Sequence, residues 1–311
     1  MNKLKKAFHC LFHQPYMLTE VLFLRFARGK NYSDEEYIKK LFYWRKWYRL
    51  DLDNPKTFAE KCQWLKLYDR KPIYRQMVDK YDAKQLVASM IGEEYVIPTY
   101  GVWDRVEDID WNSLPNKFII KPTHLGGGAG VIICKDKSSL DVENAKAVLS
   151  RVMKLDLYPN YREWGYKNMK HRIIAEQLLE DPTCAYLRDY KFYCFNGEPK
   201  VFYITSDKGI SETRQDFFDI HGNHLDLEDA MFPSSHVKIP DLPVQLDKML
   251  TIAKELAKGI PHVRIDLYEI EGKIYFGEWT FYEAAGFAEF KPKQWNYTLG
   301  EWIKLPEKTI G

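Results

Sequence analysis

No stretch of this sequence reaches the roughly 18 consecutive apolar residues that a membrane-spanning helix requires. The chain starts with positive charge, as a secretory signal does, but polar or helix-breaking residues interrupt the apolar segment that follows: His9, His13, Gln14, Pro15 and Glu20. No cleavage site made of small residues comes after it. We therefore expect neither a membrane-spanning helix nor a signal peptide.

Cysteine is scarce and scattered. None of the five lies within four residues of another: Cys10, Cys62, Cys134, Cys184 and Cys194. This spacing contains no zinc-binding pattern, and an odd number argues against a disulfide framework. We expect a reducing, cytosolic compartment.

The chain also lacks an excess of charge of either sign. Its 46 Lys and Arg residues face 44 Asp and Glu residues, which leaves a net charge of +2. Such a balance does not indicate nucleic acid as a main partner, and we expect none. Hydrophobic residues make up 45% of the 311 residues and aromatic residues 15%, enough for a sizeable core.

Basic residues gather near the start of the chain, at Lys3, Lys5, Lys6, Arg25, Arg28 and Lys30. They alternate with leucine, phenylalanine and valine, so residues 1–30 allow two interpretations. The favoured one is helices that pack on their own domain or bind a partner. The other is a basic amphipathic helix pair that lies on the inner face of a membrane.

Helical signals dominate the first third of the chain. Capping boxes begin two helices, Ser33 with Glu36 and Thr57 with Glu60, and the first is predicted to run to Arg49. A further helical stretch is predicted without a break over 72–92. We interpret the tryptophan and tyrosine residues within 43–48 as core, with a platform that stacks on sugars as the alternative.

After Pro98 the pattern changes to strands and turns. Predicted strands cover 118–122, 131–134, 173–179, 189–195, 199–205, 263–270 and 273–278, and helices cover 138–155 and 244–259. Two-residue turns at Asn196-Gly197 and Glu271-Gly272 indicate hairpins. The pattern predicts an α+β fold with mostly antiparallel pairing, and not a doubly wound sheet.

A glycine-rich loop follows the strand that ends in Lys121 and Pro122. It consists of Gly126, Gly127, Gly128, Ala129 and Gly130. Backbone N–H groups in such a loop can close on phosphate oxygens, and the lysine adds a positive charge for the same phosphates. It is neither a Walker loop nor a dinucleotide fingerprint, because it lacks Gly-Lys-Ser/Thr and leads into a strand. Alone, it is equally typical of a plain hairpin loop.

The last two predicted strands carry polar residues at alternate positions. Arg264 and Asp266 share one face of their strand, as do Glu278 and Thr280 of the next. The hairpin brings the strands together, so one face presents two carboxylates, a guanidinium and a hydroxyl. Carboxylates suit Mg²⁺ that is held together with phosphate. A cross-strand Arg–Asp ion pair of purely structural role is the alternative.

The strand over 173–179 ends in Glu176, Gln177, Leu178 and Leu179. Such an end can offer backbone N–H and C=O groups to an adenine edge and a carboxylate to its amino group. A solvated strand end is the plainer interpretation of this segment taken alone.

The order of these elements is the strongest signal. A lysine strand, a glycine loop, an adenine-edge strand and the Arg-x-Asp and Glu-x-Thr strands follow one another. In this order, the chain resembles the ATP-grasp superfamily, and most of all its TupA-like branch, named for teichuronopeptide biosynthesis in cell-surface polysaccharide clusters. The resemblance covers about 50–306 and includes these stretches: 54–58 with 60–61, 64–69, 79–81, 97–98, 118–122, 188–192, 264–267, 277–281 with Gly286, and 299–301.

The resemblance implies a role for each matching position. Lys80 and Lys121 would contact ATP phosphates, with Lys191 nearby, and residues 126–130 would form a mobile lid. Adenine would lie against Glu176 and the backbone of Gln177, Leu178 and Leu179, and ribose against Asp189. Mg²⁺ would be held by Asp266, Glu278 and Thr280, and Arg264 would stabilise the transition state. Thr280 stands where many members have Asn, which weakens the case for a second metal ion.

The fold that the resemblance implies is an ATP-grasp fold, in which two α+β lobes clasp ATP behind a helical N-terminal region. The predicted parts are an N-terminal helical segment at 1–50, a helical region before the grasp at 51–115, the glycine-loop lobe at 116–180 and the metal-binding lobe at 181–311.

The activity that we expect is an ATP-dependent carboxylate–amine ligase acting through an acyl phosphate. Its implied substrates are a uronic acid or similar carboxylate of a bacterial surface polysaccharide and an amine or amino acid. The alternatives are a kinase or sugar-modifying transferase on the same fold, and a binding module without catalysis. His124 and His171 are candidates for substrate contact, although a solvated loop is the commoner place for such histidines.

Overall fold

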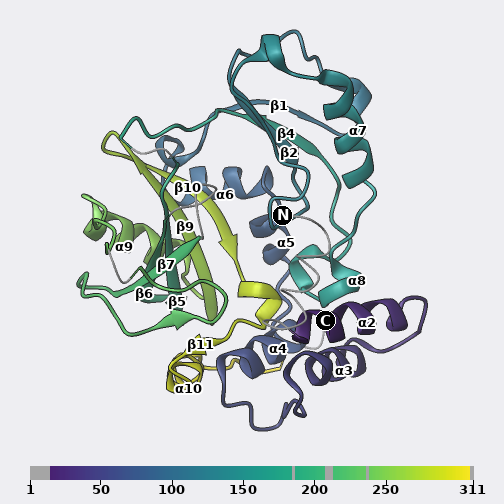
Figure 1. Ribbon diagram of the computed structural model, residues 1–311, viewed down its shortest axis with the longest axis vertical. Coiled ribbons are helices and arrows are strands. Elements are labelled where there is room, and N and C mark those ends of the chain that lie inside the picture. Colours follow the sequence, from purple (N-terminus) through teal and green to yellow (C-terminus); the bar gives the residue numbers. More distant parts are fainter. Residues whose placement is uncertain (1–14, 184–185, 207–212, 236–237, 309–311) are drawn as a thin grey trace.

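The computed structural model describes residues 15–183, 186–206, 213–235 and 238–308 (Figure 1). Its helices are α2 (Pro15–Ala27), α3 (Asp34–Lys46), α4 (Phe58–Tyr68), α5 (Ile73–Val78), α6 (Asp82–Ile91), α7 (Val142–Val152), α8 (Tyr158–Tyr161), α9 (Leu246–Leu256) and α10 (Gln294–Trp302). Its strands are β1 (Thr99–Trp103), β2 (Phe118–Pro122), β3 (Ile132–Cys134), β4 (Ile173–Glu176), β5 (Asp189–Phe195), β6 (Glu198–Ser206), β7 (Arg214–Asp219), β8 (Glu228–Asp229), β9 (His262–Ile270), β10 (Lys273–Thr280) and β11 (Phe290–Lys291).

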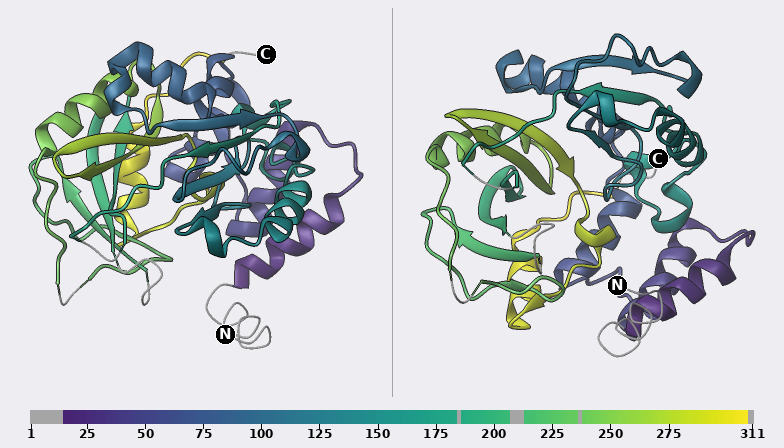
Figure 2. Two further views of the ribbon diagram at one scale, coloured as in Figure 1. Left: turned by 90° about the horizontal axis from the view of Figure 1, so that it is seen from above. Right: turned by 45° about the horizontal axis from the view of Figure 1, so that its top comes forward.

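Two antiparallel sheets form the body of the molecule. One has the order β1-β4-β2-β3 and the other the order β10-β9-β5-β6-β7, with β8 and β11 as a separate short pair. The views in Figure 2 show the two sheets as separate layers, with α7 beside the first and α9 beside the second. The predicted α+β class and antiparallel pairing are confirmed.

The two sheets differ in the size of their cores. The five-stranded sheet packs with α3, α4, α9 and α10 into one large cluster rich in phenylalanine and tyrosine. The four-stranded sheet and α7 enclose a smaller cluster around Phe118, Ile120 and Leu149. β1 comes from the predicted region 51–115 but pairs with β4 of the region 116–180, and the division into four parts stays a prediction.

Local signals located most elements correctly. Both predicted capping boxes exist, at Ser33 with Glu36 and at Thr57 with Glu60. The continuous helix expected over 72–92 is wrong, because the chain breaks between α5 and α6. There the Asp79 carboxylate accepts the N–H groups of Tyr81 and Asp82, each at 2.9 Å, and so begins a new helix.

Helix α2 packs on α3, as the favoured interpretation predicts. Its Phe23 is 1% exposed and meets the ring of Tyr37 edge-on with centroids 5.2 Å apart. Its outer face exposes Leu18, Val21, Leu22 and Phe26. Residues 1–14 of the proposed membrane segment lie outside the described residues, as do Cys10 and Cys184. No helix in the described ranges is long and apolar enough to cross a membrane.

The aromatic residues at the end of α3 are not core. Tyr43, Trp44, Trp47 and Tyr48 are each at least 37% exposed, so the interpretation as core is wrong for these four. Their neighbour Phe42 is fully buried and gives the segment the apolar periodicity that is typical of core.

Candidate active site

The register of β5, β9 and β10 gathers the polar side chains predicted on the C-terminal strands. Asp266 of β9 lies opposite both Lys191 of β5 and Glu278 of β10, and Arg264 lies opposite Thr280. The ladder slips by one residue at Gly277, where an added Cβ would come within 3.1 Å of the Asp266 carbonyl oxygen. This bulge therefore favours glycine and sets where the Glu278 side chain starts.

Arg264 is the hub of this cluster. Its Nε and Nη2 donate to the two oxygens of Asp266 at 2.6 and 2.8 Å, and Nη2 also donates to Thr280 Oγ1 at 3.0 Å. Lys191 binds the same carboxylate. Burial alone would raise the pKa of Asp266, but Arg264 and Lys191 outweigh it and hold that pKa below its ordinary value. Asp266 is therefore a buried carboxylate that is charged at neutral pH.

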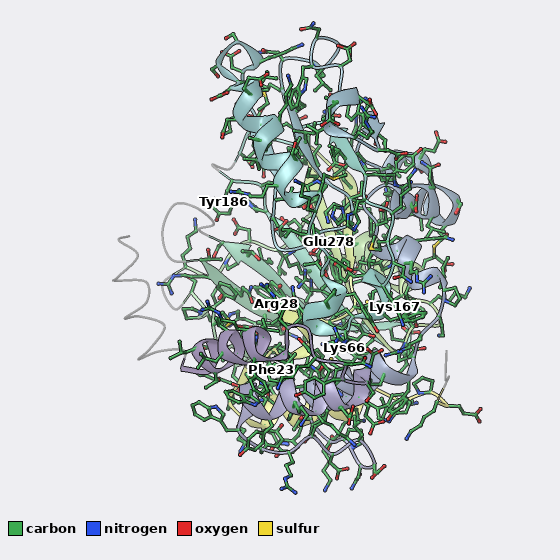
Figure 3. The ribbon with its side chains drawn as sticks, turned by 90° about the vertical axis from the view of Figure 1, so that its right-hand side faces the viewer. Phe23, Arg28, Lys66, Lys167, Tyr186 and Glu278 are labelled. Atoms are coloured by element: carbon green, nitrogen blue, oxygen red, sulfur yellow. The ribbon has the colours of Figure 1, made fainter. Side chains whose placement is uncertain are left out.

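Glu278 differs from Asp266 in its exposure. Its side chain is 44% exposed against 2% for Asp266, while Arg264 Nη2 lies 3.4 Å from its Oε1. Figure 3 shows Glu278 near the middle of the molecule, where the upper and lower parts meet. Glu278 is thus the carboxylate of this pair that a ligand can reach.

A third carboxylate at Arg264 was not predicted from the sequence. Glu283 pairs with Arg264 Nη1 from the short segment Glu283–Gly286 that follows β10. In this segment Ala284 and Ala285 have positive φ angles of 47° and 56°, and Gly286 has 73°. No local sequence pattern predicts a turn in which two alanines have positive φ angles. The tertiary contacts made by the carbonyl groups of this segment explain it.

Two side chains of helix α4 donate hydrogen bonds to the carbonyl groups of this turn. Gln63 Nε2 donates to the Gly286 carbonyl at 2.8 Å, and the Lys66 ammonium donates to the Ala285 carbonyl. Both side chains are completely buried. Burial lowers the pKa of Lys66 to about 8, although Glu163 and Cys62 act against it. Two buried donors thus fix the turn that presents Glu283 to Arg264.

A second charged cluster lies on the four-stranded sheet. Glu176, at the end of β4, binds Lys121 of β2 and Lys84 of α6, the latter at 2.9 Å. Burial would raise the pKa of Glu176, but these two lysines hold it below its usual range. No sequence motif identifies Lys84 as a site residue, because it reaches Glu176 only when α6 packs against β4.

Lys80 is positioned by the same region of backbone. Its N–H donates to the Thr123 carbonyl at 3.1 Å, and its ammonium donates to the Leu125 carbonyl just before the glycine loop. The neighbouring Asp79 accepts the Thr123 hydroxyl at 2.7 Å and Arg172 at 2.9 Å. Burial lowers the pKa of Lys80, with Glu278 as the largest opposing influence. The Lys80 ammonium therefore interacts electrostatically with Glu278 of one sheet and Glu176 of the other.

One narrow cavity joins these clusters. Its lining contains Lys80, Lys121, Glu176 and Glu278, together with Lys84 and apolar residues of α5, α6 and β10, and its volume is about 20 Å³. Four predicted site residues, from three strands and the connection between α5 and α6, therefore meet at one cavity. Asp189 and Lys191 lie beside Asp266 on the same sheet, with Lys191 Nζ 3.8 Å from Asp189 Oδ2.

The other predicted positions lie at the edges of this site. The Gln177 N–H donates to the Pro98 carbonyl at 2.9 Å, so it already has a partner, and Leu179 packs with Ile97 and Ile270. In the glycine loop Gly127, Gly128 and Gly130 have φ angles of 63°, 75° and 73°, which L-residues rarely adopt. An added Cβ at Gly127 or Gly128 would meet nothing within 4 Å, so the loop tip is open.

His124 does not lie in a solvated loop, contrary to the commoner expectation. It is 2% exposed and stacks on His171, with ring centroids 3.7 Å apart. Burial, and then the neighbouring His171, lower the pKa of His124 to about 4. At neutral pH it is an uncharged packing residue.

The donors at the Arg264 cluster fit Mg²⁺ in the way such ions are held with nucleotides. Within the described ranges no three His, Cys, Asp or Glu side chains are grouped to hold a metal ion by themselves. Mg²⁺ typically takes one or two carboxylates and completes its shell with phosphate oxygens and water. Glu278 offers open carboxylate oxygen, whereas both oxygens of Asp266 already accept from Arg264.

The comparison with known families agrees with this arrangement. The family described as "TupA-like ATPgrasp" matches residues 60–304. The chain belongs to the TupA-like ATP-grasp family. Its two facing sheets, joined at the cavity described above, are therefore the two halves of an ATP-grasp fold.

Solved structures similar to this TupA-like chain include two D-alanine–D-alanine ligases. The Bacillus anthracis enzyme, complexed with ATP, is 15% identical with a TM-score of 0.39, covering 66% of this chain and 53% of its own. The Helicobacter pylori enzyme is 14% identical with a TM-score of 0.42, covering 75% and 60%. The D-cycloserine synthetase DcsG is 17% identical with a TM-score of 0.42, covering 75% and 72%. The chain thus spans little more than half of the Bacillus anthracis ligase. No curated protein matches it.

Proposed function

We propose that this chain is an ATP-dependent ligase that joins a carboxylate to an amine through an acyl phosphate. The observation that carries the proposal is the pairing of two charged clusters at one cavity. Lys80 and Lys121 supply positive charge from one side, and Arg264 with its three carboxylates lies on the other. Such an arrangement suits a nucleotide whose γ-phosphate lies against the cluster of β9 and β10.

The nucleotide would extend along the seam between the sheets. Its adenine would lie near Glu176 and the backbone of residues 177–179, and its ribose near Asp189. Lys80, Lys121 and Lys191 would contact the phosphates, covered by the glycine loop at 126–130. With Gln177 N–H already bound to Pro98, an adenine edge would use the backbone of residues 178–179.

Mg²⁺ would be held by Glu278, Asp266 and Thr280, of which Glu278 is the most accessible. Its charge would neutralise the phosphates during transfer. Arg264 is positioned to stabilise negative charge on the transferring group, since its guanidinium is held rigidly by Asp266 and Thr280.

The reaction proceeds in two displacements. A substrate carboxylate oxygen attacks the γ-phosphorus, the bond to the bridging oxygen of ADP breaks, and an acyl phosphate forms. An amine then attacks the acyl carbon, phosphate leaves with its oxygen, and the nitrogen loses a proton. The first nucleophile is already anionic at neutral pH, so it requires positioning and charge neutralisation and no base.

The finer proposal concerns the substrates. We propose a uronic acid or similar carboxylate of a bacterial cell-surface polysaccharide, coupled to an amino acid or small amine. This rests on the resemblance of the sequence motifs to proteins of polysaccharide clusters, and not on the geometry of the site.

A kinase acting on a sugar hydroxyl is the alternative on the same fold. A kinase is expected to place an Asp or His beside its hydroxyl acceptor. His124, which the sequence offers for this purpose, is buried against His171, and this favours the ligase.

The test uses glucuronic acid labelled with ¹⁸O in its carboxylate, supplied with Mg·ATP and a pool of amino acids. Label in the released phosphate supports the ligase. Phosphate retained on the sugar identifies a kinase. Amide product with unlabelled phosphate means that activation runs through an adenylate, which contradicts the proposed chemistry.

We also propose that the outer face of α2 contacts an anionic membrane. This face carries Leu18, Val21, Leu22 and Phe26, with Arg25 and Arg28 nearby (Figure 3 labels Phe23 and Arg28). The change Leu22→Glu places a charge on this face. It should abolish co-sedimentation with vesicles of phosphatidylglycerol at low salt. The control Leu155→Glu, at a similarly exposed position after α7, should not. Equal sedimentation of both variants and the unchanged protein leaves α2 with a packing role only.

A further inference from the structure

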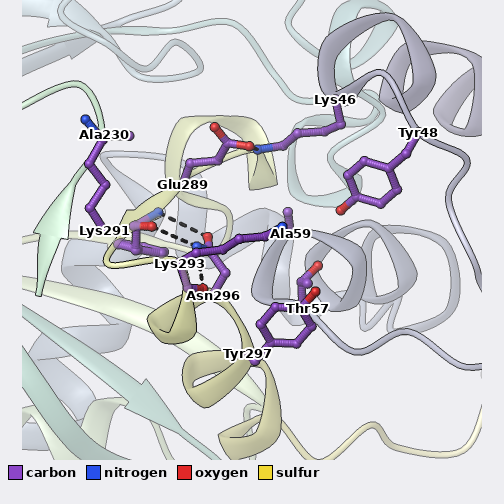
Figure 4. A pocket seen from close by; sticks show the side chains of 11 residues that line it. Lys46, Tyr48, Thr57, Ala59, Ala230, Glu289, Lys291, Lys293, Asn296 and Tyr297 are labelled. Carbon is purple, nitrogen blue, oxygen red and sulfur yellow. Dashed lines mark hydrogen bonds and ion pairs between the residues drawn. The ribbon is translucent and has the colours of Figure 1, made fainter.

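A second and larger cavity lies beyond the segment that follows β10. Its volume is about 400 Å³, against about 20 Å³ for the cavity between the sheets. Residues of α3, α4 and α10 line it together with the β8–β11 pair, as Figure 4 shows. None of the roles assigned above uses it. A cavity of this size accommodates a small organic ligand.

The charge of this cavity is positive. Its lining contains three lysines and one glutamate, a net charge of +2. Lys46 is nearly buried and binds Glu289 at 2.7 Å and the Phe287 carbonyl at 3.0 Å. Lys291 and Lys293 are exposed, and neither has an ion-pair partner within the described part of the chain. Two ammonium groups are therefore free to bind an anion.

The walls are aromatic as well as charged. Tyr48 and Tyr297 line the cavity and are 41% and 36% exposed. Burial raises the pKa of Tyr48 to about 12, so it remains a neutral phenol with a hydrophobic ring. The Glu289 carboxylate is 56% exposed and can accept hydroxyl groups. A ligand that satisfies this lining has an apolar face, several hydroxyls and negative charge.

The walls are also rigid. The Asn296 side chain bonds the Phe290 N–H at 3.0 Å and the Phe290 and Lys293 carbonyls at 2.8 and 3.1 Å. Gly300 of α10 packs so closely on the backbone before α4 that an added Cβ would come within 2.2 Å of the Lys56 carbonyl oxygen. The cavity is thus formed before any ligand arrives, which lowers the entropic cost of binding.

One segment connects this cavity with the Arg264 cluster. Glu283 binds Arg264, and six residues later Glu289 lies in the cavity wall. Six residues span at most about 20 Å even when extended. A chain of a few sugar units can cover that distance.

We infer that this cavity binds a carboxylate-bearing sugar unit, so that the substrate is an acidic oligosaccharide held at two points. The sugar ring lies against Tyr48 and Tyr297, and carboxylates of the oligosaccharide pair with Lys291 and with Lys293. The connection to catalysis rests on the proposed function, whereas binding in the cavity does not. A unit held here leaves a neighbouring unit of the same chain within reach of Arg264.

The experiment is calorimetry of the full chain at low salt with trigalacturonic acid, and with maltotriose as the neutral match. Trigalacturonic acid should bind, more weakly as salt is added, and maltotriose should bind at least about tenfold more weakly because it lacks the carboxylates. Tripolyphosphate, which has charge and no sugar face, should compete at least about tenfold more weakly than trigalacturonic acid binds. Equal binding of maltotriose, or equally strong competition by tripolyphosphate, would overturn the inference.

Variants locate the binding. Lys291→Gln with Lys293→Gln should weaken trigalacturonate about tenfold or more. Lys135→Gln with Lys154→Gln, an equal change of charge beside the four-stranded sheet, should leave it unchanged. No binding to the unchanged protein, or equal effects of both pairs, contradicts the inference. Binding of a non-hydrolysable ATP analogue, measured in parallel, reports separately on the proposed function and on the folding of each variant.

Discussion

The charged side chains at the two sheets differ in their partners and in their surroundings. At the four-stranded sheet, Lys84 and Lys121 bind the carboxylate of Glu176, and Lys80 lines the same cavity. The Lys80 ammonium donates to the backbone just before an open glycine loop. On the five-stranded sheet, Arg264 and Lys191 are tied to carboxylates by short contacts within a large aromatic core. The first arrangement is suited to grip a polyanion, and the second to hold reacting groups in fixed positions. In the proposed function, binding and chemistry are thus divided between the sheets.

The strongest test of this division is Glu278→Gln. The change keeps the shape of the side chain and removes the accessible carboxylate, so Mg²⁺-dependent turnover of ATP should fall at least about 100-fold because charge stabilisation is lost. Glu271→Gln, in the turn of the same hairpin, is the control. Calorimetry with a non-hydrolysable ATP analogue should still detect binding, with its dependence on Mg²⁺ reduced. Full activity in the variant would remove the metal role from Glu278.

A matched pair of glycines sharpens the comparison. Gly128 in the loop and Gly272 in the β9–β10 turn both have φ of 75°, and an added Cβ meets nothing within 4 Å at either. Alanine should therefore cost each variant about 1–2 kcal/mol of folding free energy, measured by urea unfolding. Only Gly128→Ala should also weaken binding of the ATP analogue, by about tenfold, because we propose that only that loop closes on phosphate. Equal effects on nucleotide binding would mean that the loop is only a connection.

The last test concerns Lys66, which supports the turn that follows the five-stranded sheet. The pKa of Lys66 is about 8 in the folded chain against an ordinary value of 10.5, so the unfolded chain binds more protons between these values. Stability supplied by this group therefore rises as pH increases from 8 to 10.5. The difference in unfolding free energy between the unchanged protein and Lys66→Met should grow over that window. Lys154→Met corrects for the loss of one lysine, and a difference that falls with pH would contradict the assignment.

What the sequence predicted was mostly local. Capping boxes, alternating strands and two-residue turns each depend on neighbours within a few positions, so α3, α4 and the β9–β10 hairpin were located from the residues alone. The facing of Arg264, Asp266, Glu278 and Thr280 followed from the same alternation.

What the sequence missed depends on contacts between distant segments. Lys84 acquires its carboxylate only when α6 reaches β4, and Glu283 its arginine only after the turn that Gln63 and Lys66 hold. The break between α5 and α6 did have a local signal, since Asp79 is a good capping residue. The apolar periodicity of 72–92 concealed it.

The carboxylates around Arg264 determine how well other cellular anions can compete for this arginine. Its nitrogens already form hydrogen bonds or ion pairs with Asp266, Glu278, Thr280 and Glu283. Free phosphate or another small cellular anion that reached this arginine would have to displace a carboxylate that belongs to the protein. Only a ligand bound elsewhere at the same time can make that exchange favourable. The cluster therefore binds small anions poorly. Its selectivity comes from the carboxylates that already surround the arginine.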